Sequence, residues 1–234
     1  MLEVRDIKVQ FGGLVAVDGV SFSIERDKIL SIIGPNGAGK TTLFTVLSGF
    51  LRPSQGTVSL DGEVLTGLPA HRVAIKGVAR TFQIVRPFRD LTALDNVMVG
   101  AYCRAKSYRE AAQLASEALD EVGLSPKRDF LAAYLTLPDL KLLEVAKALA
   151  TGPKYLLLDE VMSGLNLKEQ HDVALKLETI HARGVGILLV EHSLAIVQRM
   201  SDRVICLDNG RMIADGTSEA VMSSPAVQAA YMGI

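Results

Sequence analysis

A complete phosphate-binding pattern occupies residues 34–42, which read Gly34-Pro35-Asn36-Gly37-Ala38-Gly39-Lys40-Thr41-Thr42. The pattern follows the apolar run 29–33 and precedes a helical run from Leu43, which is the context that it requires. Its glycines let backbone N–H groups face phosphate oxygens at a helix N-terminus. We expect Lys40 to neutralise the β- and γ-phosphates of a nucleoside triphosphate, and Thr41 to place its hydroxyl on Mg²⁺. A glycine-rich turn without a ligand is the alternative, and the complete pattern in this position argues against it.

An acidic pair, Asp159-Glu160, follows the apolar run 155–158. Such a pair is commonly the solvated end of a strand, but a phosphate loop on the same sheet favours a catalytic role. We expect Asp159 to hold magnesium through water and Glu160 to polarise the attacking water as a general base.

Two further polar residues follow predicted strands. His192 comes two residues after the run 186–190 and could reach the γ-phosphate, because α/β sheets place ligands at the C-terminal ends of their strands. Gln83 follows the run 78–82 and could add a metal ligand. Each signal is weak alone, since either residue could be an ordinary loop residue with satisfied hydrogen bonds.

Short apolar runs alternate with helical patterns along the chain, which predicts βαβ units. Runs such as 155–158 are apolar throughout, as expected of parallel strands that are covered on both faces. Residues 86–152 show helical patterns and almost no strand signal, which indicates a helical lobe inserted into an α/β core. The predicted strands are residues 3–9, 20–24, 29–33, 56–60, 78–82, 155–158, 186–190 and 203–207.

Several local signals predict where helices and turns begin and end. Ser107 and Glu110 form the pattern of a capping box that opens a helix, and Gly123 is its expected end. A second helix is predicted over about residues 139–150, before Gly152-Pro153. The run Asp208-Asn209-Gly210 between apolar segments predicts a hairpin turn.

The composition limits the class of protein. The chain has 234 residues, of which 49% are hydrophobic, and a net charge of −1, which does not suggest a nucleic-acid partner. The two cysteines, Cys103 and Cys206, fit no metal-ligand spacing and are expected to remain reduced thiols. We find no secretory signal and no apolar stretch near the roughly 20 residues that a membrane span needs, so a membrane role would require a partner.

The order of these motifs resembles that of the ATP-binding cassette (ABC) ATPases over the whole chain. The resemblance implies that Gln83 is the Q-loop residue, that residues 163–166 are the D-loop and that His192 is the switch histidine. It also implies that Phe11 lies against adenine, although Phe11 could instead be an ordinary core phenylalanine. The nucleotide-binding residues would then be Phe11, Val17, Gly34, Pro35, Asn36, Gly37, Ala38, Gly39, Lys40, Thr41 and Thr42, with Thr41, Gln83 and Asp159 at the metal and Glu160 and His192 catalytic.

Within this family, the chain most resembles the branched-chain (hydrophobic) amino-acid importer ATPases. Related importers for urea, amides and aromatic acids share the same features. The segments that carry this resemblance are residues 11–18, 79–83, 95–100, 160–166, 190–192 and 227–233.

The chain departs from the family at the Leu-Ser-Gly-Gly-Gln signature, where it has Leu135-Thr136-Leu137-Pro138-Asp139. In the family, two cassettes pair head to tail and each signature contacts the ATP on the other's phosphate loop. Thr136 keeps a hydroxyl, Pro138 has no N–H, and Asp139 adds a negative charge. One lost hydrogen bond to a charged group costs about 1.5–3 kcal/mol. Proline at the first helical position and aspartate in the first turn also make a favourable helix start, so we predict a sound helix with a weakened phosphate contact.

The resemblance predicts an α/β fold: a P-loop (RecA-like) core of residues 1–85 and 153–234, with an antiparallel β subdomain and an inserted α-helical subdomain at 86–152. It implies ATP hydrolysis with Mg²⁺ that powers import of branched-chain or other hydrophobic amino acids. The implied partners are a transmembrane permease, a second ABC ATPase subunit (identical or different) and, indirectly, a solute-binding protein. The implied location is the cytoplasmic face of the cell membrane.

Three alternatives remain open. The first is an ABC ATPase for another solute, or for lipid or lipopolysaccharide extraction. The second is an ABC protein of translation or DNA repair, although those usually join two cassettes or carry long coiled-coil insertions. The third is a partner that binds ATP without hydrolysing it, against which the intact Glu160 and His192 argue.

Overall fold

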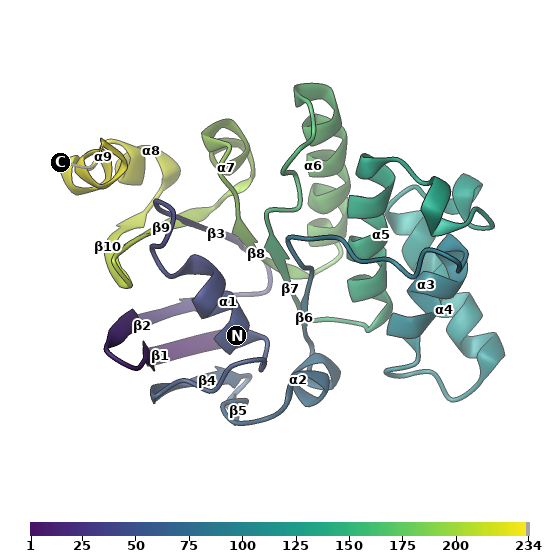
Figure 1. The fold of residues 1–234 in the computed structure, drawn as a ribbon, viewed down its shortest axis with the longest axis horizontal. Helices are drawn as coiled ribbons and strands as arrows, with labels where there is room; N and C mark the ends of the chain where they lie inside the picture. The colour runs from purple at the N-terminus through teal and green to yellow at the C-terminus, as the bar shows by residue number, and fades with distance from the viewer. Residues whose placement is uncertain (233–234) are drawn as a thin grey trace.

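Two β-sheets lie on either side of helix α1 (Lys40–Leu47) in the computed structural model, which describes residues 1–232 (Figure 1). The larger sheet of the described chain has the order β10-β9-β3-β8-β7-β6, parallel except for the antiparallel pair β9–β10. Its strands are β3 (Ile29–Ile33), β6 (Val78–Arg80), β7 (Tyr155–Asp159), β8 (Gly186–Val190), β9 (Arg203–Asp208) and β10 (Arg211–Gly216). The smaller, antiparallel sheet has the order β2-β1-β4-β5, from β1 (Leu2–Phe11), β2 (Leu14–Ile24), β4 (Gln55–Leu60) and β5 (Glu63–Val64).

The alternation of side chains along the parallel strands produces two main cores. Leu156 and Leu158 of β7 face helices α5, α6 and α7, whereas Leu157 faces α1 and the smaller sheet. Every residue of β3, β7 and β8 is buried, which explains why these strands are apolar apart from Ser31 and the terminal Asp159. The helices that cover the first face are α6 (Leu167–Ala182) and α7 (Leu194–Met200) (Figure 1).

Helices occupy the segment between β6 and β7 and lie at one end of the molecule (Figure 1). We call this segment, residues 93–150, the helical lobe. A buried apolar cluster joins its helices to β7 and β8 through residues such as Val97, Leu119 and Leu143. The lobe comprises α3 (Ala93–Ala101), α4 (Tyr108–Glu121), the 3₁₀ turns Ser125–Lys127 and Ala132–Tyr134, and α5 (Leu137–Ala150).

The remaining helices are α2 (Ala70–Lys76), before β6, and α8 (Ser218–Met222) and α9 (Pro225–Met232), at the C-terminal end of the described chain. The last two pack on β3 and β9 through a small cluster that includes Ile33, Val221 and Val227. Gly233, the last residue of the segment 227–233, lies outside the described residues. Within residues 1–232, no helix combines the length and apolar character needed to cross a lipid bilayer.

Each of the predicted strands is present, and most of them have different ends. β3 and β8 have the predicted bounds, while β1 and β2 are longer than predicted because they pair along the smaller sheet as far as Phe11 and Leu14. β6 is shorter than predicted and ends at Arg80. The hairpin turn lies where it was expected, between β9 and β10.

The predictions for helix starts were partly wrong. Ser107 Oγ accepts a hydrogen bond from Glu110 N, but the Glu110 carboxylate accepts from Lys106 N, so the predicted capping box is only half formed. Helix α5 begins at Leu137, two residues before the predicted start, because Thr136 and Asp139 form a complete capping box there.

Candidate functional site

The phosphate loop connects the buried strand β3 to helix α1. Gly34, Gly37 and Gly39 have φ angles of 143°, 83° and 98°, a region that favours glycine. A Cβ on Gly39 would lie 2.4 Å from the carbonyl oxygen of Ala16, so the neighbouring strand also requires glycine at this position. Gly39 caps α1 without any side-chain hydrogen bond, and the first turn of α1 contains no acidic residue. The first N–H groups of the helix therefore face the loop without a side-chain partner, ready for an anion.

Lys40 is buried at the centre of this loop. Its ammonium donates to the carbonyl oxygens of Gly34 at 2.7 Å and Pro35 at 2.9 Å. Burial lowers the pKa of Lys40, and the Glu160 carboxylate acts in the opposite direction. The ammonium is thus held where it can exchange loop carbonyls for phosphate oxygens.

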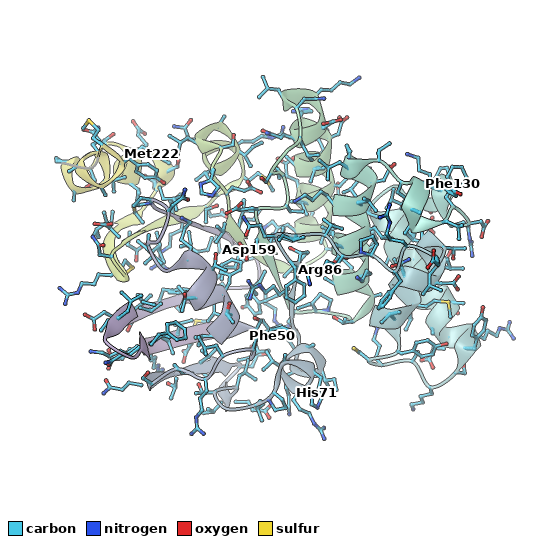
Figure 2. The ribbon with its side chains drawn as sticks, viewed as in Figure 1. Phe50, His71, Arg86, Phe130, Asp159 and Met222 are labelled. Carbon is cyan, nitrogen blue, oxygen red and sulfur yellow. The ribbon has the colours of Figure 1, made fainter. Side chains whose placement is uncertain are left out.

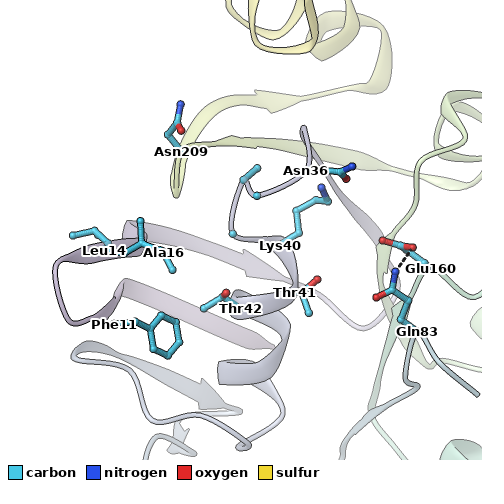
Figure 3. A pocket seen from close by; sticks show the side chains of 14 residues that line it. Phe11, Leu14, Ala16, Asn36, Lys40, Thr41, Thr42, Gln83, Glu160 and Asn209 are labelled. Atoms are coloured by element: carbon cyan, nitrogen blue, oxygen red, sulfur yellow. Dashed lines mark hydrogen bonds between the residues drawn. The ribbon is translucent and has the colours of Figure 1, made fainter. Parts of the chain in front are cut away.

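A cavity of about 510 Å³ lies in front of the loop, a size suited to a small-molecule ligand (Figure 3). Phe11 lines the cavity and is 51% exposed, so it is not an ordinary core residue. The cavity is lined by Phe11, Leu14, Val15, Ala16, Asn36, Gly37, Ala38, Gly39, Lys40, Thr41, Thr42, Gln83, Glu160 and Asn209.

Three of the predicted nucleotide-binding residues do not line this cavity. Val17 is fully buried in the core beneath the smaller sheet, with a methyl group 3.4 Å from the position of a Cβ on Gly39 of the loop, and its contact with nucleotide stays a prediction. Side chains alternate along β2, and the alternation directs Val17 inward while its neighbour Ala16 faces the cavity. Gly34 and Pro35 are the first two residues of the loop and do not line the cavity; Gly34 N donates to the hydroxyl of Tyr231 at 2.9 Å.

Glu160 is held by both of its carboxylate oxygens. Gln83 Nε2 donates to Oε2 at 2.7 Å, and His192 Nε2 lies 2.8 Å from Oε1 (Figure 3 shows the first contact). Glu160 also has a φ of 51°, an uncommon backbone conformation for a residue with a side chain, and such strain is frequent at functional sites. The structure thus brings together three residues from separate segments that the sequence predicted separately.

Asp159 lies beside them with one free oxygen. Its Oδ2 accepts a hydrogen bond from Arg80 Nη2 at 2.8 Å, whereas its Oδ1 is buried without any hydrogen-bond partner. Thr41 and Gln83, which could supply two more oxygen atoms, line the nucleotide cavity, and both also line a second cavity together with Asp159. Oxygen donors suit Mg²⁺, which usually takes one or two carboxylates together with phosphates and water. These residues therefore fit magnesium, although the described residues contain no cluster of three acidic, histidine or cysteine side chains.

Several residues of the site were not predicted as site residues. Lys141 of α5 is buried and donates to the carbonyl oxygens of Gln83 and Glu160, at 3.3 and 3.1 Å. Glu191 is also buried; it accepts from Met162 N at 2.9 Å, and burial raises its pKa to about 7. Asn209 lines the cavity from the β9–β10 turn. A lysine in an apolar helix and a glutamate after a buried strand are sequence signals for such contacts, but neither signal names a partner.

The segment in the signature position is closed by its own side chains. Asp139 Oδ2 accepts from the backbone N and the hydroxyl of Thr136, and from Lys127 Nζ at 2.6 Å. Thr136 Oγ1 accepts in turn from Asp139 N. Pro138 occupies the second helical position, because α5 begins at Leu137, and its prediction as the first was wrong. Lys127 compensates the charge of Asp139 that we expected to oppose a phosphate.

Comparison with known proteins shows which family this chain belongs to. The family model "ABC transporter" matches residues 17–163, and the model "Branched-chain amino acid ATP-binding cassette transporter" matches residues 211–234. The chain is 39% identical to the high-affinity branched-chain amino acid transport ATP-binding protein BraF of Pseudomonas aeruginosa, over 100% of this chain and 98% of that protein. It is 38% identical to LivG of Escherichia coli, with the same coverage.

Solved structures agree in fold. A nucleotide-free ATP-binding cassette from an ABC transporter superposes with a TM-score of 0.92 at 31% identity, covering 100% of this chain and 99% of that one. The ADP conformation of an ABC transporter cassette gives a TM-score of 0.91 at 31% identity, with the same coverage. The chain therefore belongs to the ABC transporter family, within the group of branched-chain amino acid transport ATP-binding proteins, and its activity is ATP hydrolysis coupled to transport.

Proposed function

We propose that this chain powers the import of branched-chain or other hydrophobic amino acids through a separate transmembrane permease. The observation that supports ATP hydrolysis is the combination of an open phosphate loop with Glu160, which is held between Gln83 and His192. Support for the solute comes from the full-length similarity to BraF and LivG and from the match of residues 211–234.

In the proposed mechanism, the triphosphate lies on the loop, where the N–H groups at the start of α1 and the Lys40 ammonium bind its oxygens. Adenine stacks on the exposed ring of Phe11. Glu160 has one side-chain partner on each oxygen, and release of either partner would make room for the attacking water whose proton Glu160 accepts. Gln83 and His192 are the partners that move, toward the metal and the γ-phosphate respectively, and their release couples nucleotide arrival to activation of the base.

Magnesium would be held by Thr41, Gln83 and Asp159, with Asp159 presenting its unpaired Oδ1. When bound, the ion neutralises charge on the β- and γ-phosphates. Arg80 leaves Oδ1 available because it occupies only Oδ2.

The proposed permease contact is a second cavity, of about 940 Å³, between α1, α2, the segment after β6 and the helical lobe. We call it the apolar groove. Exposed apolar side chains line it, including Phe50, Phe82, Ile84 and Val99. Its apolar lining fits a cytoplasmic helix of a permease, which would keep the chain peripheral on the inner face of the membrane. The helical lobe would act as the subdomain that receives this helix.

The proposed second cassette pairs head to tail with this chain. Its signature would complete the site at this chain's phosphate loop, and the self-capped start of α5 would face the partner's nucleotide. Either an identical or a different polypeptide can take this place.

The test of the proposed function is Glu160→Gln, which keeps the shape of the side chain and removes the base. We expect nucleotide binding to persist and phosphate release to fall by about 100-fold or more. In cells that lack the wild-type chain, uptake of labelled leucine should be restored by the wild type and not by the variant. Wild-type turnover in the variant would refute the role of Glu160. If the wild-type chain restores uptake of urea or of an aromatic acid but not of leucine, the proposed class of solute is wrong.

A further inference from the structure

Arg80 lines the apolar groove and contacts the carboxylate of Asp159. Its side chain is 6% exposed, and that of Asp159 is 1% exposed. The guanidinium donates to Asp159 Oδ2 at 2.8 Å through Nη2, and to Thr45 Oγ1 at 3.1 Å through Nη1. Arg80 therefore ties the last residue of β7 to the middle of α1.

Two aromatic rings enclose the same guanidinium. Its central carbon lies 5.9 Å from the ring centre of Phe44, inside the core, and 5.4 Å from that of Phe82. These distances are within the range of cation–π attraction. Phe82 is 45% exposed and packs edge-to-face on Phe50 at 5.5 Å.

The apolar groove extends from these rings to the metal end of the nucleotide cavity. Phe50 and Phe82 line the groove, and Thr41, Gln83 and Asp159 line it as well. Figure 2 shows Phe50, Arg86 and Asp159 close to one another in the middle of the molecule, between the sheets and the helical lobe. The groove and the candidate metal site thus share a wall, in which Arg80 is the buried cation.

The ion pair is suited to orienting a carboxylate. A planar guanidinium fixes the direction of its hydrogen bonds, which a lysine ammonium does not. Because Nη2 occupies Oδ2, the unpaired Oδ1 is left in a defined position. A partner that orients a metal ligand in this way commonly contributes about 10- to 100-fold to metal affinity.

We propose that Arg80 is a positioning residue that orients Asp159 for magnesium and links this carboxylate to Phe82 in the wall of the apolar groove. The inference rests on the proposed function, in which the metal lies at Asp159 and a permease helix enters the groove. A helix that displaces Phe82 would move the guanidinium, and with it the carboxylate. Docking at the groove is thereby connected to the metal site, whose proposed residues Thr41, Gln83 and Asp159 line the same groove.

The test is the magnesium dependence of nucleotide binding in Arg80→Lys, which keeps the charge and loses the planar geometry. A fluorescent ATP analogue is titrated first in EDTA and then over a series of magnesium concentrations. We expect affinity in EDTA to stay within about twofold of wild type, and half-saturation by magnesium to rise about 10-fold or more. Equal weakening with and without magnesium would show a merely structural role and overturn the proposal, as would an unchanged magnesium dependence.

Arg203→Lys is the matched control. Arg203 forms a guanidinium–carboxylate pair with Asp215, 2.5 Å apart, between β9 and β10 and outside both cavities. The Arg203→Lys variant should leave the magnesium dependence of nucleotide binding unchanged. A shift of the same size in this variant would overturn the assignment to Arg80.

Phe82→Leu tests the link and leaves the buried ion pair intact, so it serves even where Arg80→Lys does not fold. We expect half-saturation by magnesium to rise by about threefold, since a cation–π contact is weaker than the hydrogen bond. No shift in this variant would overturn the link to the groove. Failure of the proposed function is distinct: the wild-type chain would then show no magnesium-dependent nucleotide binding at all.

Discussion

Two helix starts in this molecule were predicted to contact phosphate, and they are built in opposite ways. Helix α1 has Gly39 as its N-cap, with no side-chain cap and no acidic residue in its first turn. Helix α5 is capped at Thr136 by a complete capping box, and Lys127 adds an ion pair to Asp139. The first helix leaves its N–H groups to be satisfied by a ligand, whereas the second satisfies its own.

The difference shows that a helix dipole alone does not define an anion site. Both helices carry partial positive charge at their N-termini. At α5 the carboxylate of Asp139 already occupies that position, and the hydroxyl of Thr136 donates to it. An incoming phosphate would have to displace a neutralised internal anion, while at α1 it replaces only the loop carbonyls on Lys40.

The largest expected effect comes from closing the start of α1 with Gly39→Ala. The new Cβ would lie 2.4 Å from the Ala16 carbonyl oxygen, at a φ of 98°. The loop would have to shift to relieve this contact and would lose the arrangement of N–H groups that binds phosphate, so we expect about a 100-fold loss of ATP affinity, measured by titration calorimetry. The control is Gly184→Ala, which has a φ of 90° and open space around the new Cβ, and should bind ATP like wild type. Normal binding by Gly39→Ala would show that the loop tolerates a side chain.

Removing the cation beside each helix start should affect ATP binding at α1 and leave it unchanged at α5. Lys40→Ala deletes the ammonium beside the phosphates and should weaken ATP binding in magnesium about 10- to 100-fold, the equivalent of about 1.5–3 kcal/mol. Lys127→Ala deletes the cation paired with Asp139 at the start of α5, and the Kd of the isolated chain for ATP should not change. Equal dissociation constants for wild type and Lys40→Ala would contradict the energetic role of the loop.

Opening the start of α5 should raise the activity of the chain on its own. We expect a pair of cassettes to have unequal sites when the partner carries an intact signature, because only this chain's signature position is self-capped. Replacing residues 136–139 with Ser-Gly-Gly-Gln should increase turnover of the homodimer about 10-fold, since each 1.36 kcal/mol is a decade in rate. Unchanged turnover, with dimerisation shown to be intact by light scattering, would mean that the native helix start at Leu137-Pro138-Asp139 already supports ATP hydrolysis as well as the signature does.

The smallest effect concerns stability alone. Thr136→Ala removes the cap of α5 and should lower the free energy of unfolding by about 1 kcal/mol in urea, with no change in the Kd for ATP of the isolated chain. Thr136→Ser retains the hydroxyl and should restore most of the loss. A large change in ATP affinity in either variant would indicate that this helix start contacts nucleotide within the same chain.

The sequence alone determined the features that depend on neighbouring residues. The phosphate loop, the acidic pair after β7 and the hairpin turn are contiguous, so their residue types define the local backbone and its exposed groups. The buried strands could be predicted for the same reason, because unbroken apolar runs indicate burial on both faces. Strand ends were less accurate, since the length of β1, β2 and β6 depends on the strands beside them.

Only the tertiary structure decided which distant residues meet. Gln83 and Glu160 are 77 positions apart, and Arg80 and Asp159 are 79 apart, yet each pair is in contact because β6 lies beside β7. The same is true of Lys141, whose helix must pack against the core before its ammonium reaches the carbonyls of Gln83 and Glu160. Strand order and helix packing result from burial of the whole core, and no local pattern encodes them. The sequence therefore specified the groups that can bind phosphate, and the fold specified the partners that orient Asp159 and hold Glu160.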